Sequence, residues 1–192
     1  MSYLSTVPPD KETSALFESI KQAFGFIPNF YQAQTRRPDL VKAEVGLVHA
    51  ALIGEGALTR QQKEYIFLVC SASNLSTYCV TAHCEIVRLL RLDGPDPEQV
   101  AIDHLSTALP ADTKALLNFV VKLSQQPTKV ADDDIQALRT FGFSDQQIME
   151  AVVLAGVAKF ANFVAFGLGT VPDFDNPKVA LHEAQSAVTS PL

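Results

Sequence analysis

The chain has 192 residues, of which 47% are hydrophobic and 19% charged, and its formal net charge is -6. This length suits one hydrophobic core better than two independent domains, so we expect a single globular domain over residues 1–192. A polyanion is bound by concentrated Lys and Arg, and the sequence has no basic stripe, which argues against nucleic acid as a partner.

Two further function classes are disfavoured by the ends and the apolar runs of the chain. The amino terminus, "MSYLSTVPPDKETS", has neither a positive leader nor an apolar run of signal-peptide length, so we expect a cytoplasmic protein. The longest apolar run, residues 151–169, is nearly long enough to span a bilayer, but Lys159 and Asn162 interrupt it. We therefore interpret it as a buried core helix and expect no membrane partner. Asn162 would then need a hydrogen-bond partner, at the border of a site or on a neighbouring helix.

Helical periodicity runs through almost the whole chain, and no segment alternates convincingly as a strand would. The first helix is predicted over residues 14–24, where Leu16 and Ile20 share one face. The next is predicted over residues 38–53, with Pro38 in its first turn. The fold class predicted from this pattern is all-α.

Capping signals predict where the later helices begin. Thr59 and Gln62 have the spacing of a capping box, and a helix should follow to about residue 73. Ser76 or Thr77 should begin the next helix, which ends near Leu92 before the turn sequence "DGPDP". Further helices are expected over residues 97–106, 110–127, 132–140 and 144–169, followed by a tail, residues 171–192, that forms an arm or a short terminal helix.

The segment "NLSTYCVTAHC", residues 74–84, carries the main candidate for chemistry. Cys79 falls in the first turn of the predicted helix, where exposed N–H groups lower a thiol pKa from about 8.5 toward neutrality. His83 follows at i+4, so the two side chains share a helix face. A thiol beside an imidazole is the usual pairing for an activated nucleophile.

Glu64 is the third candidate, because it lies on the preceding helix. If the two helices pack as an antiparallel pair, Glu64 comes close to His83 and could orient the imidazole or accept a proton through it. Taken singly, His83 is better explained as a core histidine, and Glu64 as a surface glutamate paired with Lys63 or Arg60.

A metal site is not expected around Cys79 and His83. A structural zinc site usually needs four N or S ligands, and the chain offers no second closely spaced Cys or His pair. The other histidines, His49, His104 and His182, are isolated. We therefore expect neither a metal nor another cofactor.

Together these residues form a family motif, E-x11-C-x2-C-x3-H, in which Glu64, Ser76, Cys79 and His83 occupy the four positions. The chain resembles the AhpD-like, carboxymuconolactone decarboxylase superfamily, and within it the alkylhydroperoxidase, or peroxidase-related, branch. The segments "FGFIPNF", "ALTRQQKEYIFLVCSASN" and "FGFSDQQIMEAVVLAGVAKFANFVAFGLG" also look like family segments, so the resemblance covers most of residues 14–170.

The resemblance implies an all-helical bundle that assembles into dimers, trimers or hexamers. It also implies an antioxidant thiol site that reduces organic hydroperoxides or recycles a partner peroxiredoxin, with electrons from a thiol reductant or a partner redox protein. In that scheme Glu64 and His83 form a proton relay, and Cys79 is the second of two paired cysteines.

The chain departs from the family at Ser76, which stands where redox members have the first cysteine. Three interpretations stay open. Cys79 acts alone through a sulfenic acid, or another cysteine resolves it, or the redox function is lost and the pocket serves a lyase that uses Glu64 and His83. A non-enzymatic, oxidant-sensing oligomer is a further alternative.

Two cysteines are candidates for the resolving thiol. Cys84 points away from Cys79 on an ideal helix, whereas Cys70 lies on the neighbouring helix and stays open. Taken singly, both are better explained as core residues. Tyr78 is expected to pack near the site.

Overall fold

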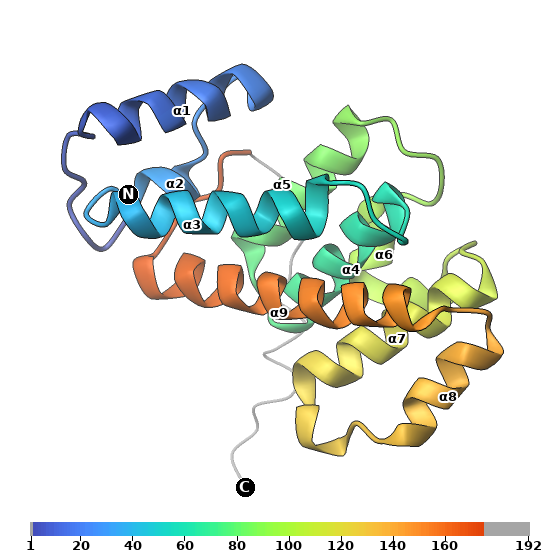
Figure 1. Cartoon of the computed structure of the whole chain (residues 1–192). Helices are drawn as coiled ribbons and strands as arrows, with labels where there is room; N and C mark the ends of the chain where they lie inside the picture. Colours follow the sequence, from blue (N-terminus) through green and yellow to red (C-terminus); the bar gives the residue numbers. More distant parts are fainter. Residues whose placement is uncertain (1, 175–192) are drawn as a thin grey trace, which may run out of the picture.

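The computed structural model describes residues 2–174, and all the regular elements in this range are helices, as predicted (Figure 1). The α-helices are α1 (Lys11–Phe24), α2 (Asn29–Gln32), α3 (Pro38–Val48), α4 (Arg60–Ser73), α5 (Thr77–Leu89), α6 (Pro97–Asp103), α7 (Ala111–Gln125), α8 (Asp132–Thr140) and α9 (Asp145–Leu168). A π-helical turn, η1 (His49–Ile53), extends α3, and two 3-10 turns, η2 (His104–Ser106) and η3 (Pro127–Lys129), follow α6 and α7.

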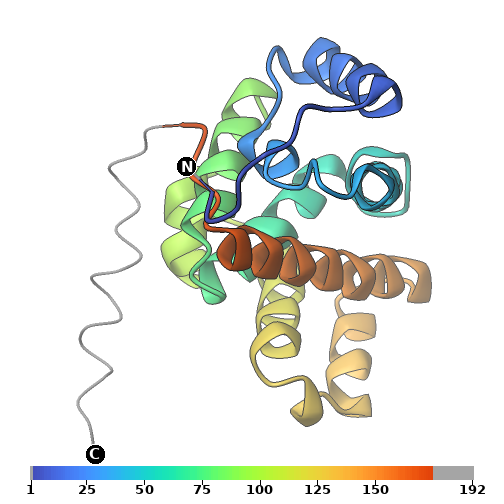
Figure 2. The ribbon, with the colours of Figure 1, turned by 90° about the vertical axis from the view of Figure 1, so that its left-hand side faces the viewer.

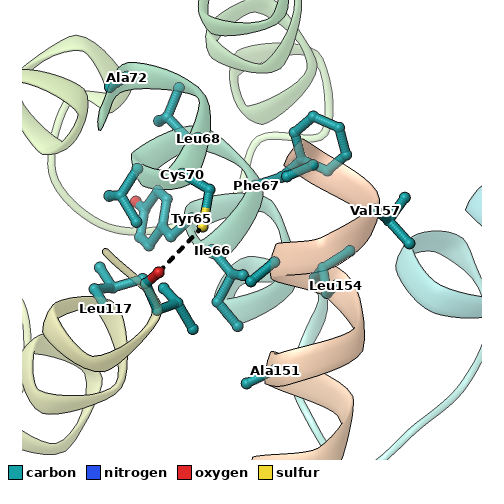
Figure 3. Packing of buried hydrophobic residues seen from close by; sticks show 14 of the residues in the cluster. Tyr65, Ile66, Phe67, Leu68, Cys70, Ala72, Leu117, Ala151, Leu154 and Val157 are labelled. Carbon is teal, nitrogen blue, oxygen red and sulfur yellow. Dashed lines mark hydrogen bonds between the residues drawn. The ribbon is translucent and has the colours of Figure 1, made fainter. Parts of the chain in front are cut away.

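Helix α4 forms the centre of the core. It packs against α5, α6, α7 and α9, and it is buried from Lys63 to Ala72 (Figure 3). A helix surrounded on all sides must be apolar around most of its circumference, which the sequence "YIFLVC" provides. Because Glu64 lies on this helix, its carboxylate is carried into the interior.

The first helix begins earlier than the predicted residue 14. Asp10 accepts a hydrogen bond from the backbone N–H of Thr13 at 2.8 Å and so caps a helix that starts at Lys11. Phe17, Ile20 and Val41 form a small second cluster between α1 and α3. Figure 2 shows this pair of helices above α9, on the side of the molecule opposite α7 and α8.

Helix α9 differs from the predicted buried core helix. Its capping box of Ser144 and Gln147 is present as expected. Its small residues face α4, α5 and α7, whereas Phe160 and Phe163 on the other side are exposed. By length and composition alone α9 is apolar enough to cross a membrane, with 44% of its most apolar stretch buried. The expectation of a core helix therefore holds for one face only.

The two ends of the described chain meet near the end of α9 (Figure 2). The backbone N–H of Tyr3 donates to the carbonyl of Leu168 at 2.8 Å. Asp173 and Phe174 then lie against α2 and the segment before it. The rest of the predicted tail, residues 175–192, lies outside the described residues.

Candidate active site

The turn between α4 and α5 sets the position of the site. Leu75 has φ 63°, a left-handed conformation that is unusual for a branched side chain. The backbone N–H of Ser76 donates to the carbonyl of Ser71 at 2.9 Å, which closes the turn. Ser76 is the N-cap of α5, so Cys79 lies in the first turn of that helix, as predicted.

Glu64 and His83 meet across the two helices. Glu64 is fully buried, and its Oε2 accepts a hydrogen bond from His83 Nδ1 at 2.7 Å, while its Oε1 lies 2.7 Å from Arg60 Nη2. Burial raises the pKa of the carboxyl, but the hydrogen bonds and positive charges of His83 and Arg60 outweigh it and hold the pKa below its usual range. The contact expected from helix pairing is present. The alternative of a surface glutamate is wrong, because Glu64 is fully buried, although its pairing with Arg60 is present.

The imidazole of His83 is fixed on two sides. Phe67 stacks on the ring with a centroid distance of 3.9 Å and an interplanar angle of 21°. Because the ionised Glu64 accepts a hydrogen bond from Nδ1–H, the neutral ring carries its free lone pair on Nε2. The ring lines a pocket, so His83 is equipped to accept a proton there.

Cys79 is buried, with 3% of its surface exposed. Burial raises the pKa of this thiol, although the polar side chains of Ser76, Asn162 and Ser71 act in the opposite direction. The expectation of a lowered pKa at the helix start is therefore wrong for the resting protein, because desolvation of the thiolate outweighs the stabilisation that the helix start provides. The thiol is neutral until a base removes its proton.

Cys79 and His83 open into one cavity of about 260 Å³. Arg60 reaches it from α4, but most of the wall is apolar, and its aromatic members are Phe26, Phe30, Tyr31, Phe67, Tyr78 and Phe174. No hydrogen bond joins Cys79 directly to His83 among the described residues. The two groups are brought together by the shared cavity.

Residues after α9 cover part of this cavity. Asp173 accepts hydrogen bonds from the backbone N–H of Asn29 at 2.9 Å and from the Tyr78 hydroxyl at 2.6 Å. Phe174 packs edge-on against Phe26, with ring centroids 5.5 Å apart. We call residues 171–174 the C-terminal strap. Tyr78, expected near the site, both lines the cavity and anchors this strap.

The other two cysteines lie elsewhere in the core. Cys70 points toward α7, where its Sγ lies 3.8 Å from the carbonyl oxygen of Val120 (Figure 3, dashed line), and burial raises its pKa to about 12. Burial likewise raises the pKa of Cys84 to about 12. All three cysteines are free thiols, and only Cys79 borders the cavity that contains His83.

Sequence reasoning missed part of the site. Ser71 gave no signal, because a serine inside a buried helix has many structural explanations. Asn162 did give one, as an amide in an apolar run, and the structure places it beside Ser71 and Cys79. Within residues 2–174 no group of three or more His, Cys, Asp or Glu side chains is arranged to hold a metal ion.

No protein-family model and no curated protein matches the sequence. The alkylhydroperoxidase AhpD core from Ralstonia eutropha, an uncharacterized peroxidase-related protein, superposes with a TM-score of 0.84 at 26% identity, covering 90% of this chain and 92% of that chain. A peroxidase-related protein from a Silicibacter species gives the same four values.

The debrominase Bmp8 in complex with 2,3,4-tribromopyrrole superposes with a TM-score of 0.75 at 18% identity, covering 98% of this chain and 100% of that chain. At this identity the likeness concerns the fold alone. The chain therefore has the all-helical AhpD-like fold, and its structural neighbours are AhpD-like peroxidase-related proteins.

Proposed function

We propose that this protein is a thiol-dependent hydroperoxidase that uses Cys79 as its redox thiol and Glu64 and His83 as a proton relay. The observation that carries the proposal is that His83, hydrogen-bonded to the buried Glu64, lines the same cavity as Cys79. The likeness to peroxidase-related proteins supports the reaction class.

The proposed reaction begins with proton transfer, because the resting thiol is neutral. His83 Nε2 takes the proton of Cys79, and Glu64 stabilises the imidazolium through Nδ1. The thiolate attacks the terminal oxygen of the hydroperoxide, the O–O bond breaks, and the alkoxide leaves with the proton from His83. The products are an alcohol and a sulfenic acid on Cys79.

An external thiol completes the cycle. One thiol condenses with the sulfenic acid, releasing water and forming a mixed disulfide, and a second thiol releases Cys79 in its reduced form. The reductant is a small thiol or a partner redox protein. The apolar wall of the cavity favours a hydroperoxide with a bulky apolar group over hydrogen peroxide.

The experiment is consumption of cumene hydroperoxide with excess dithiothreitol by wild type, Cys79→Ala and the control Cys84→Ala. We expect the Cys79→Ala protein to lose turnover while Cys84→Ala retains it. A Cys79→Ala protein that consumes the peroxide at the wild-type rate would refute the proposal.

A second candidate function is a lyase of the decarboxylase type that uses Glu64 and His83 as base and acid without redox chemistry. The raised pKa of Cys79 and the serine at position 76 favour it. In that case Cys79→Ser keeps turnover of a small carboxylated lactone, whereas the hydroperoxidase loses its activity with the same substitution.

The proposal also includes the predicted localisation, partners and oligomeric state of the protein. The protein is cytoplasmic, it binds neither nucleic acid nor membrane, and it forms a homo-oligomer. The exposed apolar face of α9, which includes Met149, Phe160 and Phe163, is the surface that we assign to a second copy of the chain.

A further inference from the structure

Ser76 is buried with its hydroxyl unused. The residue is 1% exposed, and its Oγ finds no hydrogen-bond partner of normal geometry among the described residues. It also does not cap α5 with its side chain. A buried hydroxyl without a partner destabilises the folded protein, so a compensating role is expected for it in another state of the site.

Ser76 is the N-cap residue of α5 and Cys79 is the third residue of that helix, a spacing that directs an N-cap side chain toward the third residue. Asn162 and Ser71, from α9 and α4, act together with Ser76 to lower the pKa of the Cys79 thiol against the effect of burial. Three side chains able to donate a hydrogen bond therefore lie around this thiol, and no hydrogen bond of normal geometry joins any of them to the sulfur among the described residues.

Hydrogen bonds to neighbouring side chains fix the orientation of Asn162 and Ser71. Asn162 Oδ1 accepts a hydrogen bond from Asn74 Nδ2 at 2.9 Å, and Asn162 Nδ2 donates to Ser71 Oγ at 2.9 Å. The Ser71 oxygen thus acts as an acceptor from Asn162, which leaves its hydroxyl hydrogen free for the sulfur. Asn74 is itself held by Ser124, whose hydroxyl donates to Asn74 Oδ1 at 3.2 Å.

A neutral thiol is a weak acceptor and does not need three donors. A thiolate, or an oxygen atom bonded to the sulfur, is a much stronger acceptor. The other side of Cys79 opens into the apolar cavity through which a substrate would arrive. The sulfur therefore lies between an apolar entrance and a polar back wall.

We propose that Ser71, Ser76 and Asn162 form a donor cradle that stabilises negative charge on the Cys79 sulfur and on the oxygen that the sulfur receives from a hydroperoxide. The inference rests on the proposed function and deepens it. Ser76 takes the place of a resolving cysteine by holding the sulfenic acid through hydrogen bonds, and no disulfide forms within the chain.

The electrons balance without a second cysteine in the chain. The sulfur gives two electrons to the peroxide, the O–O bond breaks, an S–O bond forms, and the alkoxide leaves as the alcohol after taking a proton from His83. The sulfenic acid then persists in the cradle until an external thiol attacks the sulfur and releases the oxygen as water. Cys70 and Cys84 take no part.

The lifetime of this sulfenic acid tests the cradle. Full-length wild type, Ser76→Ala and the control Ser73→Ala are each treated with an excess of cumene hydroperoxide, and dimedone is added after increasing delays. Ser73 is a matched control because it is the last residue of α4, three positions before Ser76, and its hydroxyl donates to the carbonyl of Cys70 at 2.9 Å. Mass spectrometry then measures the dimedone adduct on Cys79.

We expect the yield of dimedone adduct to fall with the delay at least fivefold faster in Ser76→Ala than in wild type and Ser73→Ala. A second molecule of the hydroperoxide oxidises the unprotected sulfenic acid to sulfinic acid, giving its oxygen and leaving as the alcohol. Equal lifetimes in all three proteins would overturn the cradle. A further variant, Ser76→Cys, guards against a folding artefact: treated the same way, it should form a disulfide with Cys79 and yield no adduct. If it forms no disulfide, position 76 does not face the sulfur and the inference is wrong.

A second readout separates the cradle from the peroxidase proposal. The rate of Cys79 alkylation by iodoacetamide is followed against pH, and loss of the Ser76 donor should move the profile to higher pH. If hydroperoxide leaves wild-type Cys79 unmodified but the profile shifts, the peroxidase proposal fails and the cradle for the charged sulfur stands. If peroxide is turned over and neither profile nor lifetime changes, the cradle fails and the peroxidase proposal stands.

Discussion

Glu64 Oε2 lies 2.7 Å from His83 Nδ1, although the two residues are 19 positions apart in the sequence. The short turn at residues 74–76 brings them together by sending α5 back along α4. Arg60 completes the arrangement at the other carboxylate oxygen. Glu64 is therefore held in its charged form inside the core, where it can stabilise a protonated imidazole.

Replacement of Glu64 by glutamine should separate this electrostatic role from packing. The Glu64→Gln side chain fills the same space but cannot balance an imidazolium, so we expect turnover of cumene hydroperoxide to fall by about 100-fold or more. The exposed Glu55→Gln is the control. Circular dichroism checks that both proteins fold. An unchanged rate of turnover in folded Glu64→Gln would refute the proton relay.

Glu44 should make the stability of the protein depend on pH. It is buried on α3, Gln34 Nε2 donates to its Oε2 at 2.8 Å, its Oε1 has no partner, and burial raises its pKa to about 7. The folded state thus favours the protonated carboxyl. The contribution of Glu44 to the free energy of unfolding is complete below pH 4.5 and is lost as the pH rises through about 7. The total loss is on the order of 3 kcal/mol.

The Glu44→Gln protein should lack this loss. Urea unfolding at pH 4.5, 6, 7 and 8 measures the free energy of unfolding. As the pH rises, this free energy should increase in Glu44→Gln relative to the wild type, whereas Glu55→Gln should follow the wild type throughout. A difference between Glu44→Gln and wild type that stays constant with pH would contradict the assignment.

A narrower cavity should impair the turnover of a bulky hydroperoxide more than the turnover of hydrogen peroxide. Ala82 lines the cavity one turn of α5 from Cys79, so Ala82→Phe places a ring where a bulky substrate would bind. We expect the KM for cumene hydroperoxide to rise about tenfold or more, in the range of a steric clash. The rate with hydrogen peroxide should change little. Equal effects on both peroxides would mean that the cavity does not select the substrate.

The C-terminal strap should control access to Cys79. Asp173→Ala removes the acceptor for Asn29 N–H and for the Tyr78 hydroxyl, which frees Phe174 from the cavity wall. Alkylation of Cys79 by iodoacetamide at fixed pH should then become several-fold faster. Asp145→Ala, which removes the exposed partner of Arg139, is the control and should react like the wild type. A rate unaltered by Asp173→Ala would show that the strap does not limit access.

The exposed face of α9 should mediate self-association. Phe163 is 68% exposed on this face, so Phe163→Glu places a negative charge where a second copy is proposed to pack. Light scattering during size-exclusion chromatography should show an oligomer for wild type and a monomer for the variant, with Leu89→Glu on α5 as the exposed control. A monomeric wild type that floats with phospholipid vesicles would instead point to a membrane surface.

The sequence by itself determined the helices and the identities of the residues that meet at the site. Capping residues such as Thr59 and Ser144 act within a few positions, so the starts of α4 and α9 are readable from local chemistry. The pairing of Glu64 with His83 was also readable, because a short turn between two apolar helices allows few arrangements. The predicted start of α1 at residue 14 is wrong because Asp10, in a stretch without helical periodicity, caps the helix at Lys11.

Only the tertiary structure decided the charge state of Cys79 and the partners of Asn162. The pKa of a thiol depends on how much water the surrounding helices exclude, and burial between α4, α5 and α9 is not a local property of the sequence. The exposed side of α9 likewise depends on which face its neighbours cover. A pattern of apolar residues predicts that a helix packs, but the atoms around each polar side chain are fixed only when the helices have assembled.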